Sequence, residues 1–177
     1  MWIFGYGSLI WKPGFDYIER RDGFIEDWKR RFWQGSVDHR GVPGSPGRVA
    51  TLLPEAGERV WGAAYRVSHQ EYGEIVAQLD HREKGGYERH RIDVITPEAE
   101  PEIIEEVLMY VATDTNRDWQ GPASTAEIIE QILASEGPSG TNLEYLLRLA
   151  GALREMEVED AHVFELEAVA MRLLRGV

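Results

Sequence analysis

Short apolar segments recur through the first half of the chain, and residues 91–94 alternate between polar and apolar side chains, patterns that predict β-strands. The run from Trp2 to Phe4 ends at a glycine and predicts a short buried strand. A turn containing proline and glycine is expected at 54–57, between two of these strands. Strands are predicted at residues 2–4, 23–25, 31–33, 49–53, 60–67, 87–95 and 103–112.

Apolar residues follow a helical spacing in one internal segment and in the last third of the chain. Each helix is expected to begin at a side chain that can cap its first turn. These capping residues are Ser68, Ser124, Thr141 and Asp160. The predicted inward-facing stripes include Tyr72, Ile75, Val76 and Leu79 in the internal helix, and Phe164, Ala168, Met171 and Leu174 in the last helix. Strands followed by helices indicate an α+β fold, with helices against an antiparallel sheet or barrel.

The length and the composition fit one globular domain. The chain has 177 residues, of which 43% are hydrophobic, and it contains no internal repeat and no clear linker. We therefore expect a single domain over residues 1–177.

The charge balance and the apolar runs argue against several classes of partner. The formal net charge is −12, the opposite of the basic surface that nucleic-acid binding needs. No apolar run approaches the ~18 residues of a membrane helix, and the N-terminus lacks the pattern of a signal peptide. We expect no nucleic-acid or membrane partner and a cytoplasmic location, and the oligomeric state is left open.

Few residues are available for nucleophilic or metal-dependent chemistry. The chain contains no cysteine, which rules out disulfides, thiol nucleophiles and cysteine metal sites. The five histidines show neither H-x-x-x-H nor H-E-x-x-H spacing, so no metal site is expected. A mechanism that rests on one carboxylate and backbone donors fits the residues better.

A glycine-containing loop follows the first predicted strand, and we call it the glycine loop. It consists of Gly5, Tyr6, Gly7, Ser8 and Leu9. Glycine lets a ligand approach the backbone closely, and successive N–H groups in such a turn can bind an anion. The loop is therefore a candidate cradle for a carboxylate or an oxyanion, and an ordinary glycine turn is the alternative. Ile10 replaces the third glycine of a dinucleotide fingerprint, and no glycine completes a nucleophile elbow around Ser8.

Glu83 extends the apolar stripe of the internal helix by one turn. Residues 72, 76, 79 and 83 share a helix face, which places this carboxylate on the inward side near the end of the helix. Burial and the negative end of the helix dipole are expected to disfavour its charge, and such a glutamate can act as a general base. The alternative is that Glu83 turns outward or pairs with Arg82 or Lys84.

The segment from Gly35 to Arg48 is rich in glycine, proline and serine, and it predicts a long loop. Arg40 and Arg48 are candidates for holding a substrate carboxylate, because guanidinium groups bind carboxylates through two parallel hydrogen bonds. The alternative is that they pair with Asp38 or another neighbouring acid.

Several blocks of sequence, in order along nearly the whole chain, resemble the ChaC-like, glutathione-specific γ-glutamylcyclotransferases. No single block is diagnostic, but together they are specific to that family. They are FGYGSLIW at 4–11, FWQGS at 32–36, DHRGVPG at 38–44, PGRV at 46–49, LDHREKGGY at 79–87, GPSG at 137–140 and NLEYL at 142–146.

The resemblance implies a small, antiparallel or mixed β-barrel with packed helices, and cleavage of glutathione to 5-oxoproline and cysteinylglycine without a cofactor. The family's γ-glutamyl-binding loop corresponds to the glycine loop, and its catalytic glutamate corresponds to Glu83. A tyrosine on a later strand of the family corresponds to Tyr110. Two alternatives remain: a cyclotransferase for other γ-glutamyl amides, and a non-enzymatic small-ligand-binding regulator of cation transport.

Overall fold

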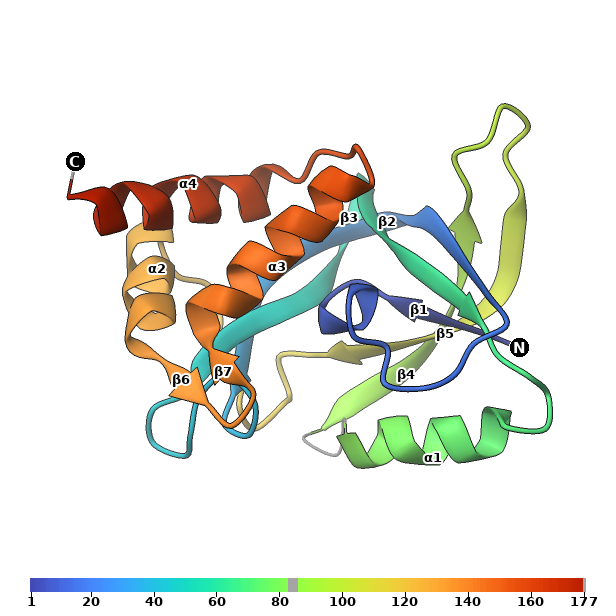
Figure 1. The fold of residues 1–177 in the computed structure, drawn as a ribbon, viewed down its shortest axis with the longest axis horizontal. Helices are drawn as coiled ribbons and strands as arrows, with labels where there is room; N and C mark the ends of the chain where they lie inside the picture. Colours follow the sequence, from blue (N-terminus) through green and yellow to red (C-terminus); the bar gives the residue numbers. More distant parts are fainter. Residues whose placement is uncertain (83–85, 177) are drawn as a thin grey trace. The chain divides into compact units, whose positions relative to one another are not determined.

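The computed structural model describes residues 1–82 and 86–176 (Figure 1). The elements are β1 (Trp2–Gly5), the 3-10 turn η1 (Ser8–Ile10), β2 (Glu19–Ser36), β3 (Gly47–Arg66), α1 (Tyr72–Arg82), β4 (Tyr87–Ile95), β5 (Ile103–Ala112), α2 (Thr125–Ala134), β6 (Glu136–Gly137), β7 (Gly140–Thr141), α3 (Asn142–Glu155) and α4 (Ala161–Arg175). No helix among these residues is long and apolar enough to cross a membrane.

The strands form a closed barrel in the order β1-β3-β2-β4-β5. Strand β1 lies between an antiparallel neighbour and a parallel one, because Ile3 is in register with Tyr65 of β3 and with Leu108 of β5. The barrel is completed where Phe24 of β2 pairs with Ile95 of β4. The mixed barrel and the helices together confirm the predicted α+β fold.

The chain divides into two compact units. Unit 1 contains Met1–Lys29 and Leu52–Arg117, and unit 2 contains Arg30–Thr51 and Asp118–Val177, so β2 and β3 each contribute residues to both. The single domain expected over residues 1–177 stays a prediction.

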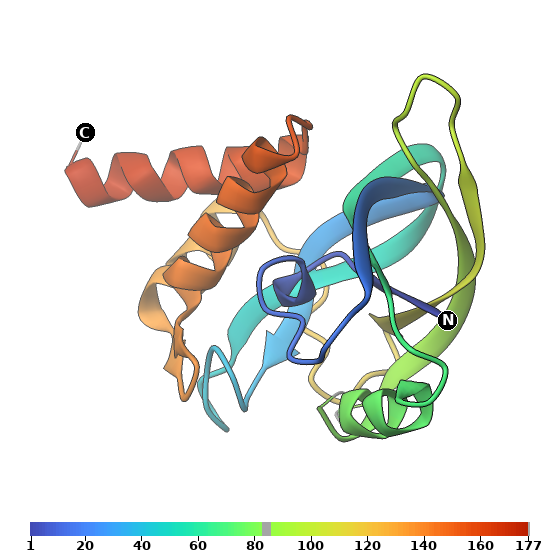
Figure 2. The same ribbon diagram turned by 45° about the vertical axis from the view of Figure 1, so that its right-hand side comes forward.

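In unit 1, helix α1 packs on the outside of the barrel, beside β1 and β5 (Figure 2). Ile75 and Leu79 of the helix are buried against Ile3 and Leu108, while Tyr72 and Val76 are partly buried at the edge of the same cluster. The predicted apolar stripe of this helix is therefore confirmed. In unit 2, α2, α3 and α4 contact one another.

The turn predicted at 54–57 is wrong, because β3 runs without interruption through these positions. Gly57 and Asp27 both adopt positive φ, and the Gly57 amide donates to the Asp27 carboxylate at 2.8 Å. Ion pairs flank this irregularity, joining Arg59 to Glu26 and Lys29 to Glu55. Proline and glycine therefore mark an exposed strand irregularity, which is a position where a strand tolerates both.

The inward face predicted for the last helix is also wrong. Asp160 does cap α4, accepting from the Val163 amide at 3.1 Å, but the buried residues are Val163, Leu166 and Ala170. Leu174 is 56% exposed. The helix carries apolar side chains on two faces, so spacing alone does not select the buried one.

Candidate functional site

The glycine loop joins β1 to η1 in unit 1, and close backbone packing fixes its shape. A Cβ atom on Gly5 would stand 2.5 Å from the Cβ atom of Leu9, so no larger residue fits there without a shift. Gly62 of β3 is equally confined, because its Cβ atom would stand 2.3 Å from the carbonyl oxygen of Gly5. The loop therefore folds back on itself while β3 lies directly against its first residue.

Tyr65 anchors the far end of the glycine loop. Its hydroxyl lies 2.8 Å from the carbonyl oxygen of Leu9 and 3.0 Å from that of Ile10, and donates to this pair of oxygens. Burial raises the pKa of Tyr65 to about 12, so the hydroxyl keeps its proton at neutral pH. A hydrogen bond from a buried, neutral side chain thus holds η1 to the barrel wall.

Tyr6 connects the glycine loop to β5. Its hydroxyl donates to the carbonyl oxygen of Tyr110 at 2.8 Å, and both residues are buried. Leu9 packs against the same apolar cluster that contains the Tyr110 side chain. The structure thus brings together two of the elements that the sequence proposed as one site, the glycine loop and Tyr110.

The Tyr110 hydroxyl points toward α1 and meets Asp80. It donates to the Asp80 carboxylate at 2.7 Å, and Arg89 of β4 donates to the same carboxylate from its Nε atom at 2.9 Å and from Nη2. The Tyr110 hydrogen bond and Arg89 hold the pKa of Asp80 below its usual range. Burial, and then the bond to Asp80, raise the pKa of Tyr110.

Glu83, the predicted general base, lies outside the described residues, and its role stays a prediction. In the sequence it directly follows Arg82, the last residue of α1. The helix that leads to it is held by Ile75 and Leu79, which are 5% and 3% exposed.

Arg40 lies in unit 2 and has a carboxylate partner there. Its Nη1 atom donates to Glu144 and to the carbonyl oxygen of Thr141, both at 3.0 Å, and its guanidinium lies over the ring of Tyr145. The neighbouring acid is thus Glu144, which is distant in sequence, rather than Asp38. Substrate binding by Arg40 stays a prediction.

Arg48 donates hydrogen bonds to backbone carbonyl groups within unit 2. It is 6% exposed, and it donates to the carbonyl oxygens of Phe32 and Gly121 at 3.0 Å and to the Gln131 side chain at 2.7 Å. Burial lowers the pKa of Arg48. Its hydrogen bonds tie β2 to α2 and to the segment that precedes α2.

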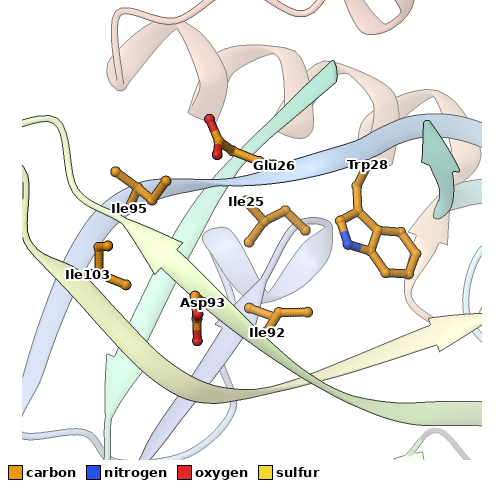
Figure 3. A pocket seen from close by; sticks show the side chains of 7 residues that line it. All are labelled: Ile25, Glu26, Trp28, Ile92, Asp93, Ile95 and Ile103. Carbon is orange, nitrogen blue, oxygen red and sulfur yellow. The ribbon is translucent and has the colours of Figure 1, made fainter. Parts of the chain in front are cut away.

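A groove of about 290 Å³ opens on unit 1 between β2 and β4 (Figure 3). Its lining residues are Ile25, Glu26, Trp28, Ile92, Asp93, Ile95 and Ile103. None of the described candidate site residues lines it. Within residues 1–82 and 86–176, no three His, Cys, Asp or Glu side chains gather in a way that would hold a metal ion.

Sequence analysis missed Asp80, Tyr65 and Gly62. Asp80 follows Val76 by one helical turn, so the helical periodicity places it beside the apolar stripe and next to the inward face. That spacing is a usable signal. Tyr65 and Gly62 carry no such local signal, because their partners lie in the glycine loop, far away in the sequence.

Comparisons with known proteins agree on one family. The model of the ChaC-like protein family matches residues 1–173. Glutathione-specific gamma-glutamylcyclotransferase 1 of Danio rerio is 42% identical, over 100% of this chain and 92% of its own length. The human protein of the same name is 43% identical, over 92% of this chain and 75% of its own length.

Solved structures give the same result. The selenomethionine-labelled crystal structure of a yeast γ-glutamylcyclotransferase specific to glutathione aligns with a TM-score of 0.89. It is 29% identical, and the alignment covers 97% of this chain and 96% of the yeast chain. A protein titled gamma-glutamyl cyclotransferase shares the fold at 16% identity, with a TM-score of 0.56 over 94% of this chain and 86% of its own. By its sequence and by its fold, the chain belongs to the ChaC-like family.

Proposed function

We propose that this protein is a glutathione-specific γ-glutamylcyclotransferase, an enzyme that cleaves glutathione to 5-oxoproline and cysteinylglycine. The observation that carries the proposal is the match to relatives with that name, over 92% of the length of one and 75% of the length of the other. These relatives come from fish and human at 42% and 43% identity, and a yeast enzyme specific to glutathione shares the whole fold.

The reaction is an intramolecular amide exchange. The α-amino nitrogen of the γ-glutamyl group attacks its own γ-carbonyl carbon, and a new C–N bond closes a five-membered ring. The C–N bond to cysteine then breaks, and the leaving nitrogen takes up the proton that the amine has lost. Atoms and electrons balance without water, an oxidant or a cofactor. The enzyme must hold the amine against the carbonyl and move one proton, both of which lower the barrier substantially.

Glu83 carries the proton in this proposal. It removes a proton from the substrate's α-ammonium and gives it to the leaving nitrogen, so one carboxylate acts first as base and then as acid. The attacking nitrogen loses a second proton as the lactam forms, and the freed α-amino group of cysteinylglycine takes up that proton. The family resemblance of the segment from Leu79 to Tyr87 supports this assignment. The sequence spacing supports it as well, because Glu83 follows the buried Leu79 by four residues.

The glycine loop binds the γ-glutamyl group in this proposal. Its N–H groups hold either the α-carboxylate or the oxyanion that develops on the γ-carbonyl. The confinement of Gly5 and Gly62 supports this role, because a loop held rigidly at both ends keeps its donors in place without reorganisation. Tyr110 and Arg40 are proposed as further substrate contacts.

We also propose a cytoplasmic location and a small-molecule substrate, with no nucleic-acid or membrane partner and no oligomeric state assigned. The substrate supports the location, since glutathione is a principal thiol of the reducing cytosol.

The test is to incubate the purified protein with glutathione and to follow both products by mass spectrometry. We expect 5-oxoproline and cysteinylglycine in equal amounts, and no turnover in Glu83→Gln. Glu105→Gln is the matched control, because it removes an exposed carboxylate from β5 of the same unit. If the protein turned over other γ-glutamyl amides but not glutathione, it would be a cyclotransferase with a different substrate. Binding of glutathione without any turnover would favour a regulatory binding protein.

A further inference from the structure

Tyr110 is held at both ends, by different parts of unit 1. Its carbonyl oxygen accepts the Tyr6 hydroxyl at 2.8 Å, and its own hydroxyl donates to Asp80 at 2.7 Å. Between these two bonds the side chain packs in the cluster that contains Leu79 and Leu9. The position and the orientation of its hydroxyl are therefore fixed by side chains from the glycine loop and from α1.

The direction of the Asp80 hydrogen bond decides what Tyr110 can offer a ligand. An ionised carboxylate only accepts hydrogen bonds, so the single hydroxyl proton of Tyr110 is committed to Asp80. Arg89 secures the charge on Asp80 by donating to the same carboxylate from two nitrogen atoms. The Arg89 side chain also interacts with the Tyr110 hydroxyl. The phenol oxygen therefore has no proton to give and one lone pair left for a further donor.

We propose that Asp80 is a positioning residue: it orients the Tyr110 hydroxyl as a pure acceptor, which receives a hydrogen bond from the α-amino group of the γ-glutamyl substrate. This proposal rests on the proposed function and refines it. A donor-only group such as an ammonium suits an acceptor, whereas a carboxylate would be repelled by the same oxygen. The bond would orient the nitrogen for its attack on the γ-carbonyl.

Asp80 belongs to the same helix as Leu79, which anchors α1 in the apolar cluster. Glu83 follows Asp80 by three residues in the sequence. One segment thus supplies both the proposed base and the group that orients the proposed acceptor, and both serve the same amine.

The experiment is a double-mutant cycle with Asp80→Asn and Tyr110→Phe, measured as kcat and KM for glutathione. Asparagine keeps the size of aspartate, but its amide can donate to the phenol oxygen and occupy the acceptor. We expect each single variant to lower kcat about tenfold, because the orientation of the amine is lost. In the Tyr110→Phe background, Asp80→Asn should then have no further effect on kcat.

Two further variants separate positioning from stability. Asp80→Glu keeps the carboxylate and should recover part of the activity lost in Asp80→Asn. Glu26→Gln is the matched control, because Glu26 also forms an exposed ion pair with an arginine of unit 1, Arg59 at 3.0 Å. It should leave kcat and KM unchanged.

Nuclear magnetic resonance of ¹³Cζ-labelled tyrosine tests the geometry without activity. The Tyr110 resonance, identified by its loss in Tyr110→Phe, should shift in Asp80→Asn and stay in Glu26→Gln. Two results would overturn the proposal. One is a loss of kcat in the double variant that equals the combined losses of the two single variants, and the other is a Tyr110 resonance that does not shift in Asp80→Asn. If Asp80→Asn shifts the resonance but the wild-type protein does not turn over glutathione, the hydrogen bond is present and the proposed function is refuted, together with the substrate contact.

Discussion

The hydroxyl of Tyr65 lies 2.8 Å from the carbonyl oxygen of Leu9, and this bond ties the end of the glycine loop to the barrel wall. The two residues come from η1 and β3, and the hydroxyl also reaches the carbonyl oxygen of Ile10. The loop proposed to bind the substrate is therefore held by a side chain that need not touch the substrate.

Tyr65→Phe should lower the free energy of unfolding by about 1–2 kcal/mol, because a buried carbonyl loses its donor. It should also lower kcat/KM for glutathione, since the glycine loop loses its anchor. Urea unfolding and steady-state kinetics measure the two effects. Tyr17→Phe is the control: its ring packs on Tyr65 but is 46% exposed. Equal losses in the two variants would contradict the anchoring role.

Gly62→Ala should destabilise the protein by about 1–3 kcal/mol, as expected when an atom is forced into a filled space. The new Cβ atom would meet the carbonyl oxygen of Gly5 at 2.3 Å and the Phe4 ring at 2.7 Å. Activity should fall as well, because β1 carries the glycine loop. Thermal unfolding and glutathione turnover provide the measurements.

Gly73→Ala is the opposite case and serves as the comparison. Gly73 lies in α1, where a Cβ atom would meet nothing within 4 Å. Alanine should therefore stabilise the helix by about 0.5–1 kcal/mol. If Gly62→Ala were as stable as Gly73→Ala, the close approach of β3 to Gly5 would not matter.

His162 should make the stability depend on pH. Its Nε2 atom accepts a hydrogen bond from the Phe32 amide at 3.1 Å, which requires the neutral ring, and burial lowers the pKa of His162 to about 4. Because this value lies below that of the unfolded chain, protonation favours unfolding. The contribution is complete above pH ~6.5 and is lost as the pH falls toward 4, by at most about 3 kcal/mol.

Urea unfolding at a series of pH values, with His162→Gln for comparison, isolates this contribution. Glutamine can still accept from Phe32 but does not titrate. The neighbouring charged groups are Arg30, Arg31, Asp160 and Glu165, and they remain in both proteins. The difference in stability between the two proteins should change between pH 6.5 and 4. A constant difference across that range would show that His162 is not the titrating group.

Asp160→Asn should destabilise unit 2 by about 3 kcal/mol or more, because the carboxylate is paired with a buried guanidinium. Arg30 donates to Asp160 at 2.5 Å, and its side chain is 0% exposed. Asparagine can still cap α4, so the loss measures the charge rather than the cap. Glu167→Gln, which breaks an ion pair with the exposed Arg154, should cost less than about 1 kcal/mol. Similar losses in thermal or urea unfolding would contradict this contrast.

Local sequence predicted the elements whose signals are local. The bounds of the strands predicted at 87–95 and 103–112 match those of β4 and β5 residue for residue, and Ser124 caps α2 through a complete capping box. The turn at 54–57 was wrong, because its proline and glycine lie at an exposed irregularity shared with Asp27, which pattern alone does not show.

The same limit applies to the candidate site. The glycine loop stands out because two glycines around an aromatic residue are a local signal. Tyr65 and Gly62 were missed because their contacts are made across strands and depend on the barrel register. The spacing of α1 places Asp80 beside the inward face, but its partner Tyr110 lies on β5, 30 residues further along the chain. Only a folded chain reveals which hydroxyl meets which carboxylate.

The position of β1 has a consequence for how the protein is made. The strand that leads into the glycine loop is synthesised before both of its neighbours in the barrel, β3 and β5, and Tyr6 bonds a partner 104 residues further along the chain. β1 of a nascent chain therefore leaves the ribosome unpaired, and its pairing on both sides cannot be completed until β5 emerges. Since contacts so distant in sequence slow folding, the site should form late, and a fragment ending before β5 should be inactive.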